Sequence, residues 1–367
     1  MISTKIKLCI IHPNLKCGGS ERFISIMCNN INTDLFDVEL YILDGADVFY
    51  KIVNPSVKIT FLSIKNVRKS LFTILHIIKK SKPDILFTAS NHLNLFLSIF
   101  KFLLPKKLKF VARESNTISM NNQRSKYGRL YEWLTKKFYN NINNIICQCA
   151  FMQNDLVDNY KIKKTNTVII YNPVEDIMQR QIVNIRNRKR QYKFFTVARL
   201  SPEKGIDRLL ESLSLLDIDF NYYIIGHGEE KNSLQQMTNN LNLQNKVFFE
   251  GQKMHPYENM HDADLFLIGS RYEGFPNVLL EAGVLGIPVV GFNSPGGISE
   301  IIEESVNGFL AENNNIRSLA DIIYKALNYN FNRQFIIDQT KEKFSAGKII
   351  HQLENYLLGI YQNNFAD

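Results

Sequence analysis

The chain has 367 residues, of which 45% are apolar and 22% charged, a composition typical of a folded protein with two domains. This excludes a disordered chain, a collagen-like repeat and a small disulfide-stapled domain. The longest apolar run, residues 93–104, is shorter than a membrane span of roughly 18–20 residues. Residues 1–11 lack the apolar core and cleavage site of a signal peptide. We therefore expect a cytosolic protein whose five cysteines are reduced.

The formal net charge of +9 is unevenly distributed along the chain. Residues 1–172 contain 25 Lys and Arg against 11 Asp and Glu, whereas residues 173–367 contain 19 against 24. A general lysine bias of the genome does not explain this difference. A basic half favours a polyanionic partner, either an anionic membrane or a nucleic acid. Because no RNP, zinc-finger or KH-type pattern is present, we expect a membrane surface and no nucleic acid.

One stretch of the basic half, residues 64–82, has the pattern of a basic amphipathic helix. Leu71, Ile74, Leu75 and Ile78 follow helical spacing, and lysines and an arginine flank them. Such a helix can lie in a lipid interface. The alternative is a helix packed on a sheet with its lysines in water, and the apolar stripe favours that alternative.

Strand-like and helical patterns alternate along the first half of the chain. Seven strands are expected, at residues 5–12, 38–43, 57–62, 84–88, 108–112, 144–147 and 168–171. Helical stretches lie between most of them, which predicts βα units and a parallel sheet. Residues 175–193 are polar and charged and show no strand signal, so we place the domain boundary there.

The same alternation restarts in the second half. Strands are expected at residues 194–198, 222–225, 247–250, 265–268, 289–291 and 308–310. Helices are expected at residues 205–214, 229–241, 276–285 and 316–328, with one long tail helix at 341–362. The prediction is an α/β fold of two Rossmann-like, doubly wound domains facing a central cleft, with ligand at the carboxyl ends of the strands. The first comprises residues 1–174 joined by the C-terminal helix 344–367, and the second comprises residues 190–343.

Three glycine-rich loops directly follow expected strands. They are CGGSER at residues 17–22, IIGHGE at 224–229 and PGG at 295–297. Glycine lets the backbone approach a ligand closely, and the amides of a following helix form an anion site. The first loop is not the GxGxxG of dinucleotide binding, and its alternative is a plain tight turn. In the second loop, His227 is equally well explained as a loop residue without a task.

Two segments carry charged residues at expected strand ends. In ARLSPEKG, Arg199 and Lys204 suit a diphosphate leaving group, or else they are surface charges of a solvated turn. In EGFPNVLLE, Glu273 precedes a helix that begins near Pro276, and Glu281 lies within it. A carboxylate can bind ribose hydroxyls with both oxygens. Two surface glutamates are the alternative, but these flank an otherwise apolar helix.

In this order, these motifs resemble the retaining glycosyltransferases of family 4, which have the GT-B fold, and in particular their capsule, O-antigen and exopolysaccharide branch. The matching segments are GGSER, ARLSPEKG, IIGHGEE, FEGQ, SRYEGFPNVLLEA and PGGISEII. They cover nearly the whole chain, although the N-terminal half matches only in its glycine loop and strand rhythm.

The resemblance implies roles for the matching residues. Arg199 and Lys204 would neutralise the departing diphosphate, and Glu273 would contact the transferred sugar near its anomeric carbon. Glu281 would bind the nucleotide ribose. The further positions implied in donor binding are Gly18, Gly19, Gly226, Phe275, Pro276, Asn277, Val278 and Leu279.

On the acceptor side, many family members carry a His or Asp where this chain reads VARESN, residues 111–116. Arg113 and Glu114 are the candidates there, and a buried ion pair is the equal alternative. The resemblance implies no metal, so we interpret the DxD-like strings at 217–219 and 262–264 as structural. It also implies front-face attack, with the departing phosphate as base.

The implied function is a hexosyltransferase at the inner face of the plasma membrane, acting in surface polysaccharide (O-antigen or capsule) biosynthesis. It would move a hexose or N-acetylhexosamine from a nucleotide sugar, expected to be UDP-linked, to a glycan on a polyprenyl diphosphate. One alternative is a GT-B nucleotide-sugar epimerase, a class that lacks the EGFPNVLLEA segment. The other is a non-catalytic scaffold that binds nucleotide sugars, which the intact Arg199, Lys204, Glu273 and Glu281 argue against.

Overall fold

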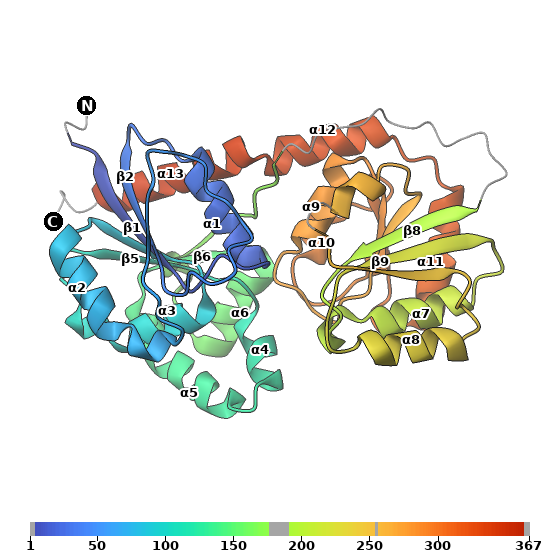
Figure 1. Ribbon diagram of the computed structural model, residues 1–367, viewed down its shortest axis with the longest axis horizontal. Helices are drawn as coiled ribbons and strands as arrows, with labels where there is room; N and C mark the ends of the chain where they lie inside the picture. The colour runs from blue at the N-terminus through green and yellow to red at the C-terminus, as the bar shows by residue number, and fades with distance from the viewer. Residues whose placement is uncertain (1–3, 176–190, 254–255, 363–367) are drawn as a thin grey trace. The chain divides into compact units, whose positions relative to one another are not determined.

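The computed structural model describes residues 4–175, 191–253 and 256–362, in two compact units (Figure 1). Unit 1 comprises Met1–Glu175 and Phe344–Asp367, and unit 2 comprises Asp176–Lys343. Each unit is built on its own parallel sheet, which confirms the predicted α/β class. Most of the expected linker, residues 176–190, and the chain end at 363–367 lie outside the described residues.

Unit 1 contains a seven-stranded parallel sheet in the order β3-β2-β1-β4-β5-β6-β7. Its strands are β1 (Ile6–His12), β2 (Phe36–Ile42), β3 (Lys58–Phe61), β4 (Ile85–Thr88), β5 (Lys109–Arg113), β6 (Asn144–Cys147) and β7 (Thr167–Ile169). The central strand β1 is buried at all but one position. Such a continuous apolar strand is expected when helices cover both faces of a sheet.

The strand order places helices on both faces of this sheet. The chain runs outward from β1 to β3 and then returns to β4, so right-handed crossovers change face at that point. Helices α1 (Gly19–Asn30) and α13 (Ala346–Gln362) cover one face, and α2 (Leu71–Ser81) and α3 (Asn91–Ile99) cover the other (Figure 1). Helix α5 (Gly128–Phe138) packs against α3. The remaining helices of unit 1 are α4 (Ile118–Arg124) and α6 (Ala150–Tyr160).

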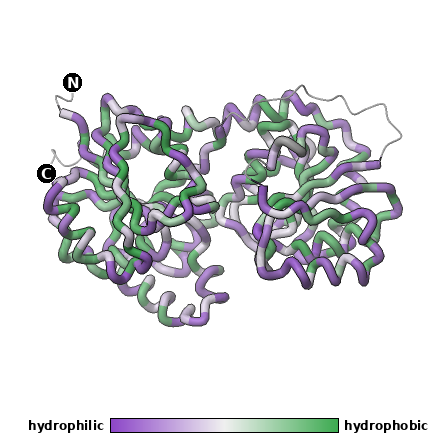
Figure 2. Tube along the Cα trace, viewed as in Figure 1, coloured by the Kyte–Doolittle hydropathy of each residue, from purple (hydrophilic) through white to green (hydrophobic). Residues whose placement is uncertain are grey.

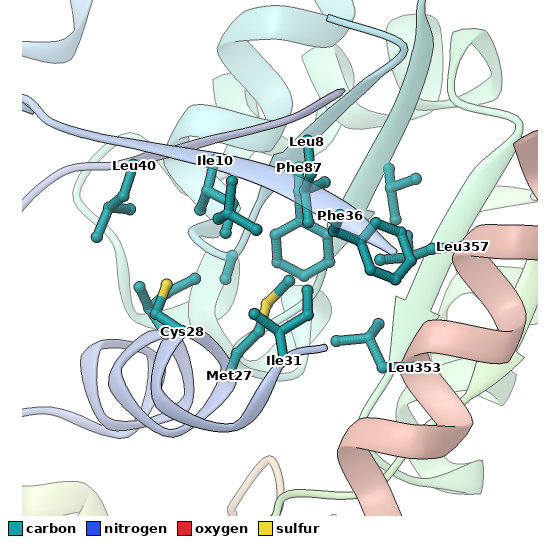
Figure 3. Packing of buried hydrophobic residues seen from close by; sticks show 14 of the residues in the cluster. Leu8, Ile10, Met27, Cys28, Ile31, Phe36, Leu40, Phe87, Leu353 and Leu357 are labelled. Atoms are coloured by element: carbon teal, nitrogen blue, oxygen red, sulfur yellow. The ribbon is translucent and has the colours of Figure 1, made fainter. Parts of the chain in front are cut away.

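The core beneath α1 and α13 joins the chain's beginning to its end. Phe36 and Phe87 extend from the sheet toward Met27 of α1, and Leu353 and Leu357 of α13 pack beside them (Figure 3). All five side chains are buried, and each buried aliphatic or aromatic side chain contributes roughly 1.5–3 kcal/mol. The C-terminal helix is therefore an integral part of unit 1.

The expectation of one tail helix over 341–362 is wrong. Helix α12 (Arg333–Phe344) ends before Ser345, and α13 starts after it. At this break Val174 forms a parallel bridge with Ser345. Its amide donates to the Phe344 carbonyl at 2.8 Å, and its carbonyl accepts from the Ala346 amide at 2.9 Å. These bonds to another segment replace part of the helical ladder, which sequence periodicity does not reveal.

Unit 2 contains a six-stranded parallel sheet in the order β10-β9-β8-β11-β12-β13. The strands are β8 (Tyr192–Val197), β9 (Phe220–Ile225), β10 (Val247–Gly251), β11 (Leu265–Ile268), β12 (Val289–Phe292) and β13 (Gly308–Ala311). The hydropathy colouring shows these strands as mostly apolar segments between polar helix surfaces (Figure 2). The expected strands are all present, with ends shifted by up to two residues.

Helices also cover both faces of this second sheet. Helices α7 (Ile206–Ser214), α8 (Lys231–Asn240) and α11 (Ile316–Asn328) share one face and its apolar core. Helices α9 (Asn277–Val284), α10 (Ile298–Ile301) and α12 lie on the other face (Figure 1). This doubly wound arrangement leaves the strand ends and their loops available for ligands.

The basic stretch 64–82 forms a helix packed on its own unit. Ile74, Ile77 and Ile78 of α2 are buried, so its apolar stripe faces the protein interior, as the favoured alternative expected. Among the described residues, no helix is both long and apolar enough to cross a bilayer.

Candidate functional site

The motifs of unit 2 lie at the carboxyl ends of its central strands. Arg199 is exposed in the loop after β8, and Lys204 lies in a 3-10 turn, Pro202–Lys204, that follows. Glu273 lies in the loop between β11 and α9. Because β8 and β11 are parallel neighbours, their carboxyl ends meet at one edge of the sheet.

Lys204 and Glu273 form the central ion pair of this edge. The Lys204 Nζ lies 2.7 Å from the Glu273 Oε1, and the Ser270 hydroxyl donates to the same oxygen at 2.6 Å. The lysine side chain is 26% exposed and the glutamate side chain 12%. Partial burial strengthens a charge-assisted hydrogen bond, so two donors fix the orientation of this carboxylate while solvent still reaches the pair.

Glycines allow the loops at this edge to approach one another. A Cβ on Gly226, directly after β9, would lie 1.8 Å from the Ala198 carbonyl oxygen. Gly296 has a φ of +119°, and a Cβ there would lie 2.0 Å from the carbonyl oxygen of Glu273. A side chain at position 226 would displace the loop that carries Arg199, and one at position 296 would displace the loop that carries Glu273.

An arginine clamp holds the turn that carries Lys204. Arg271 donates to both carboxylate oxygens of Asp207, at 2.9 and 2.5 Å, and to the Pro202 carbonyl at 2.6 Å. Its own amide donates to the Glu203 carbonyl at 2.8 Å. Burial alone would raise the pKa of Asp207, but Arg271 lowers it below its usual value. The planar fork of Arg271 therefore fixes the turn to the end of β11.

A second arginine, Arg208, is buried beneath the same edge. Its guanidinium donates to the Gly269 carbonyl and to the Asn314 Oδ1 at 2.5 Å, and it stacks on Phe292 at 4.2 Å. Burial lowers the pKa of Arg208 to about 10, which leaves it cationic at neutral pH. It ties the end of β11 to the loop after β13.

Helix α9 brings the remaining motif residues to this edge. It begins at Asn277, directly after Pro276, and Phe275 and Leu279 are buried. Proline has no side-chain oxygen to cap the first-turn amides. Glu281, in the fifth position of the helix, is also buried. The helix thus fixes Glu281 relative to the loop that carries Glu273.

In unit 1, the glycine loop leads from β1 into α1. Helix α1 begins at Gly19, and Gly18 before it is extended. A Cβ on Gly18 would lie 2.3 Å from the Glu21 carboxylate, which also accepts the Ser20 hydroxyl at 2.8 Å. Glycine at position 18 therefore makes room for Glu21 to fold back over the loop.

Arg113 and Glu114 lie in the interior of unit 1, at the end of β5. Arg113 stacks on Phe23 at 3.7 Å and donates to the Asn172 side chain. Burial lowers the pKa of Arg113 to about 9. The Glu114 Oε1 accepts from the Tyr139 hydroxyl at 2.7 Å and from the Asn94 amide at 2.8 Å.

This buried network is incompletely satisfied. Among the described residues, the Arg113 Nε and Nη1, the Glu114 Oε2 and the His12 Nε2 are buried polar atoms without a hydrogen-bond partner. Burial raises the pKa of Glu114 to about 7, although Tyr139, Asn94 and Arg113 all oppose this shift. Burial likewise lowers the pKa of His12. The network therefore stores unfavourable desolvation energy that the surrounding fold must offset.

The DxD-like strings serve the fold at the opposite, amino ends of the strands. Asp264 accepts the Lys193 amide at 2.8 Å, and Asp262 pairs with the Lys193 side chain. Asp219 accepts from Gln191 at 2.9 Å. Among the described residues, no group of three or more His, Cys, Asp or Glu side chains is placed to hold a metal ion.

Two protein families match consecutive parts of the chain. Glycosyltransferase Family 4 matches residues 17–176, and Glycosyl transferases group 1 matches residues 178–343. The chain belongs to the family 4 glycosyltransferases. The resemblance to this family is thereby confirmed, and the two parallel sheets together with the matching solved structures confirm the GT-B fold. The capsule, O-antigen and exopolysaccharide branch and the retaining mechanism stay predictions.

Several relatives of this transferase have names that indicate a glycosyl transfer reaction. It is 25% identical, over 96% of its length and all of the relative's, to a Campylobacter jejuni N-acetylgalactosamine-N,N'-diacetylbacillosaminyl-diphospho-undecaprenol 4-alpha-N-acetylgalactosaminyltransferase. It is 26% identical, over 81% of its length and 83% of the relative's, to the Escherichia coli O-antigen biosynthesis glycosyltransferase WbnH. The structure of Anabaena HepE in complex with UDP and glucose matches with a TM-score of 0.75 at 20% identity, covering 96% of this chain and all of that one.

The structure identifies several residues of the candidate site that the sequence motifs did not predict. Ser270, Arg271, Asp207 and Arg208 position the charged loops of unit 2, and they lie within or beside the matching segments. Arg271, Asp207 and Arg208 have partners distant in sequence, so only the fold identifies them. Ser270 donates to Glu273, three residues further along the chain. Asn94 is different, because a polar residue in the apolar run 93–104 was a visible signal of a buried hydrogen bond.

Proposed function

We propose that this glycosyltransferase moves a hexose or N-acetylhexosamine from a UDP-sugar to a lipid-linked glycan, with retention of configuration. The observation that carries the proposal is the contact of Lys204 with Glu273, at a strand edge that also presents Arg199. A cation and a carboxylate side by side suit a donor with an anionic diphosphate next to a polyhydroxyl sugar.

Each charged group of unit 2 has a proposed task. Arg199 and Lys204 bind the diphosphate and neutralise the charge that develops as it leaves, so no metal is required. Glu281 accepts hydrogen bonds from the ribose hydroxyls, and Glu273 contacts the transferred sugar. Backbone amides at the start of α9 bind sugar or phosphate.

The proposed step balances without an enzymatic base. The bond between the anomeric carbon and the diphosphate oxygen breaks, and the acceptor oxygen bonds to that carbon on the same face. The acceptor proton passes to the departing phosphate. Gly18 and Gly19 stay proposed contacts of the diphosphate, and Arg113 and Glu114 stay proposed elements of the acceptor side. Their burial favours a role in holding that side in shape.

Two relatives support the acceptor class. One is named for an undecaprenyl-diphosphate-linked glycan and the other for O-antigen biosynthesis. A nucleotide sugar is soluble and a polyprenyl diphosphate is membrane-bound, so we propose that the enzyme works peripherally at the inner face of the plasma membrane.

The experiment is nucleotide release from UDP-, GDP- and ADP-sugars, with and without bacterial lipid extract and with and without EDTA. We expect lipid-dependent release from a UDP-sugar, unaffected by EDTA and lost in Glu281→Ala. Release from another nucleotide would refute the donor, and inhibition by EDTA would refute metal independence. Binding of a nucleotide sugar without turnover under any acceptor condition would instead support a scaffold.

A further inference from the structure

Helix α5 of unit 1 turns apolar side chains to solvent. Leu130 and Trp133 are 52% and 53% exposed, and Tyr127, just before the helix, is 58% exposed. The opposite side of the helix packs inward, where Thr135 is buried and Tyr131 contacts His92 of α3. Large apolar residues grouped on an outer face indicate an interaction surface.

The same face is strongly cationic. Leu130, Trp133 and Lys137 follow one another at intervals of three or four residues and so form one stripe of the helix, and Lys126 lies in the turn just before it. The Lys126 Nζ lies 5.9 Å from the Tyr127 ring centre, and the Lys137 Nζ lies 4.9 Å from that of Trp133. Along the chain, the apolar residues of this face therefore have a lysine on each side.

Two further cations widen this α5 face. Arg129 and Lys136 are exposed beside the stripe. The acidic residue of the helix, Glu132, is paired with Lys136 at 2.6 Å. The face therefore carries a net positive charge, in the half of the chain where basic residues outnumber acidic ones by 25 to 11.

We propose that the α5 face docks on an anionic phospholipid surface. Tryptophan and tyrosine are favoured at the boundary between acyl chains and headgroups, where one part of the ring is apolar and another polar. Lysines on each side of the apolar residues can extend their stems and place their ammonium groups among lipid phosphates. An acidic protein partner would satisfy the lysines but not require the central tryptophan and leucine.

This assignment differs from the sequence expectation for residues 64–82. In α2 the isoleucines of the apolar stripe face inward, and its large exposed apolar residue is Phe72, at 83%. Helix α5 instead exposes two large apolar residues within its cationic stripe. Helices α2 and α5 are thus the two alternative docking surfaces that an experiment must distinguish.

This inference rests on the proposed function, because docking on a membrane would bring the enzyme to a lipid-linked acceptor. Its test needs neither donor nor acceptor, however. If the protein does not bind vesicles, the docking proposal is wrong but the proposed transferase reaction is unaffected. If the protein binds vesicles but releases no nucleotide from any donor, the proposed reaction is wrong but the docking proposal is unaffected.

The chain's single tryptophan, Trp133, provides the probe. The intact protein is titrated with vesicles of phosphatidylcholine containing about one third phosphatidylglycerol, and separately with phosphatidylcholine alone. We expect binding to the anionic vesicles, weakened by salt, with a blue shift of Trp133 emission. Phospholipid brominated in its acyl chains should quench this emission.

Matched variants separate the two helices. Lys126→Gln with Lys137→Gln removes two charges from the α5 face, and Lys79→Gln with Lys80→Gln removes two exposed charges from α2. Each lysine near a membrane surface contributes about fivefold to affinity, so the α5 pair should lose about 25-fold. The α2 pair should lose less than threefold, with both circular dichroism spectra unchanged.

Three results would overturn the proposal. The first is absence of binding to anionic vesicles at low salt. The second is binding without a change or quenching of Trp133 emission, which would place another face on the lipid. The third is a loss in the α2 pair equal to or larger than that in the α5 pair.

Discussion

The two units differ in the charges that their strand ends expose. In unit 2, Arg199 is exposed and the Lys204–Glu273 pair is partly open to solvent. In unit 1, Arg113 and Glu114 occupy the corresponding carboxyl edge of a similar sheet but are buried. The same topology therefore either offers charge to a ligand or uses it to tie loops together.

The difference follows from the neighbours of each charged group. Arg199 precedes a 3-10 turn that begins at a proline. Glycine at position 226 lets the neighbouring loop pack closely against the backbone just before Arg199. Arg113 is instead the last residue of β5 and is covered by the Phe23 ring of α1. Exposed charges can change partners during a reaction cycle, whereas buried ones change partners only at a large desolvation cost.

The largest expected effect concerns Lys204. In Lys204→Ala the departing diphosphate loses a cation and Glu273 loses its partner, so turnover should fall about 100- to 1000-fold. The melting temperature should change by less than about 2 °C, because the pair is only partly buried. Lys231→Ala, an exposed lysine at the start of α8, is the control and should keep wild-type turnover. Equal turnover in both variants would remove Lys204 from the site.

The next prediction concerns the pH dependence that Glu114 gives to unit 1. Burial raises the folded pKa of Glu114 from 4.5 to about 7. Between these values the folded state holds a proton that the unfolded state has released, so stability falls as pH rises through this window. The total loss is about 3 kcal/mol. Glu114→Gln, which keeps an oxygen for Tyr139 and Asn94, should remove it.

The measurement is the free energy of unfolding of both proteins from pH 4 to pH 8. His12, whose pKa is lowered by burial, adds the opposite slope to both proteins, so their difference isolates Glu114. Parallel curves would mean that Glu114 has the same pKa in the folded and the unfolded protein, which would contradict the account that burial raises it.

The smallest effect concerns the arginine clamp of unit 2. Arg271→Lys cannot keep the two-pronged bond to Asp207, so the turn that carries Lys204 should loosen. We expect about tenfold lower turnover, equivalent to about 1.4 kcal/mol of transition-state binding, and a higher KM for the donor. A lower melting temperature with unchanged turnover per folded molecule would show that the clamp serves only stability.

Much of the fold and of unit 2 could be predicted from the sequence. Alternating apolar runs marked every strand, and the glycine and proline signals marked the loops that carry Arg199 and Glu273. The break at Ser345 could not be predicted, because it depends on a bridge to Val174, far away in the sequence. Periodicity also could not show which basic helix turns its apolar side outward, since α2 and α5 differ in what packs against them.

The central claim is that unit 2 offers the charges of Arg199 and Lys204 to ligand, while unit 1 uses Arg113 to hold its fold. Arg199→Ala and Arg113→Ala test it with the same substitution in each unit, by nucleotide release and melting temperature measured on the same samples. The account predicts that Arg199→Ala loses at least about 100-fold in release at unchanged melting temperature. It predicts that Arg113→Ala destabilises unit 1 by about 2 kcal/mol. Unchanged release in Arg199→Ala, or an Arg113→Ala variant as stable as wild type, would contradict it.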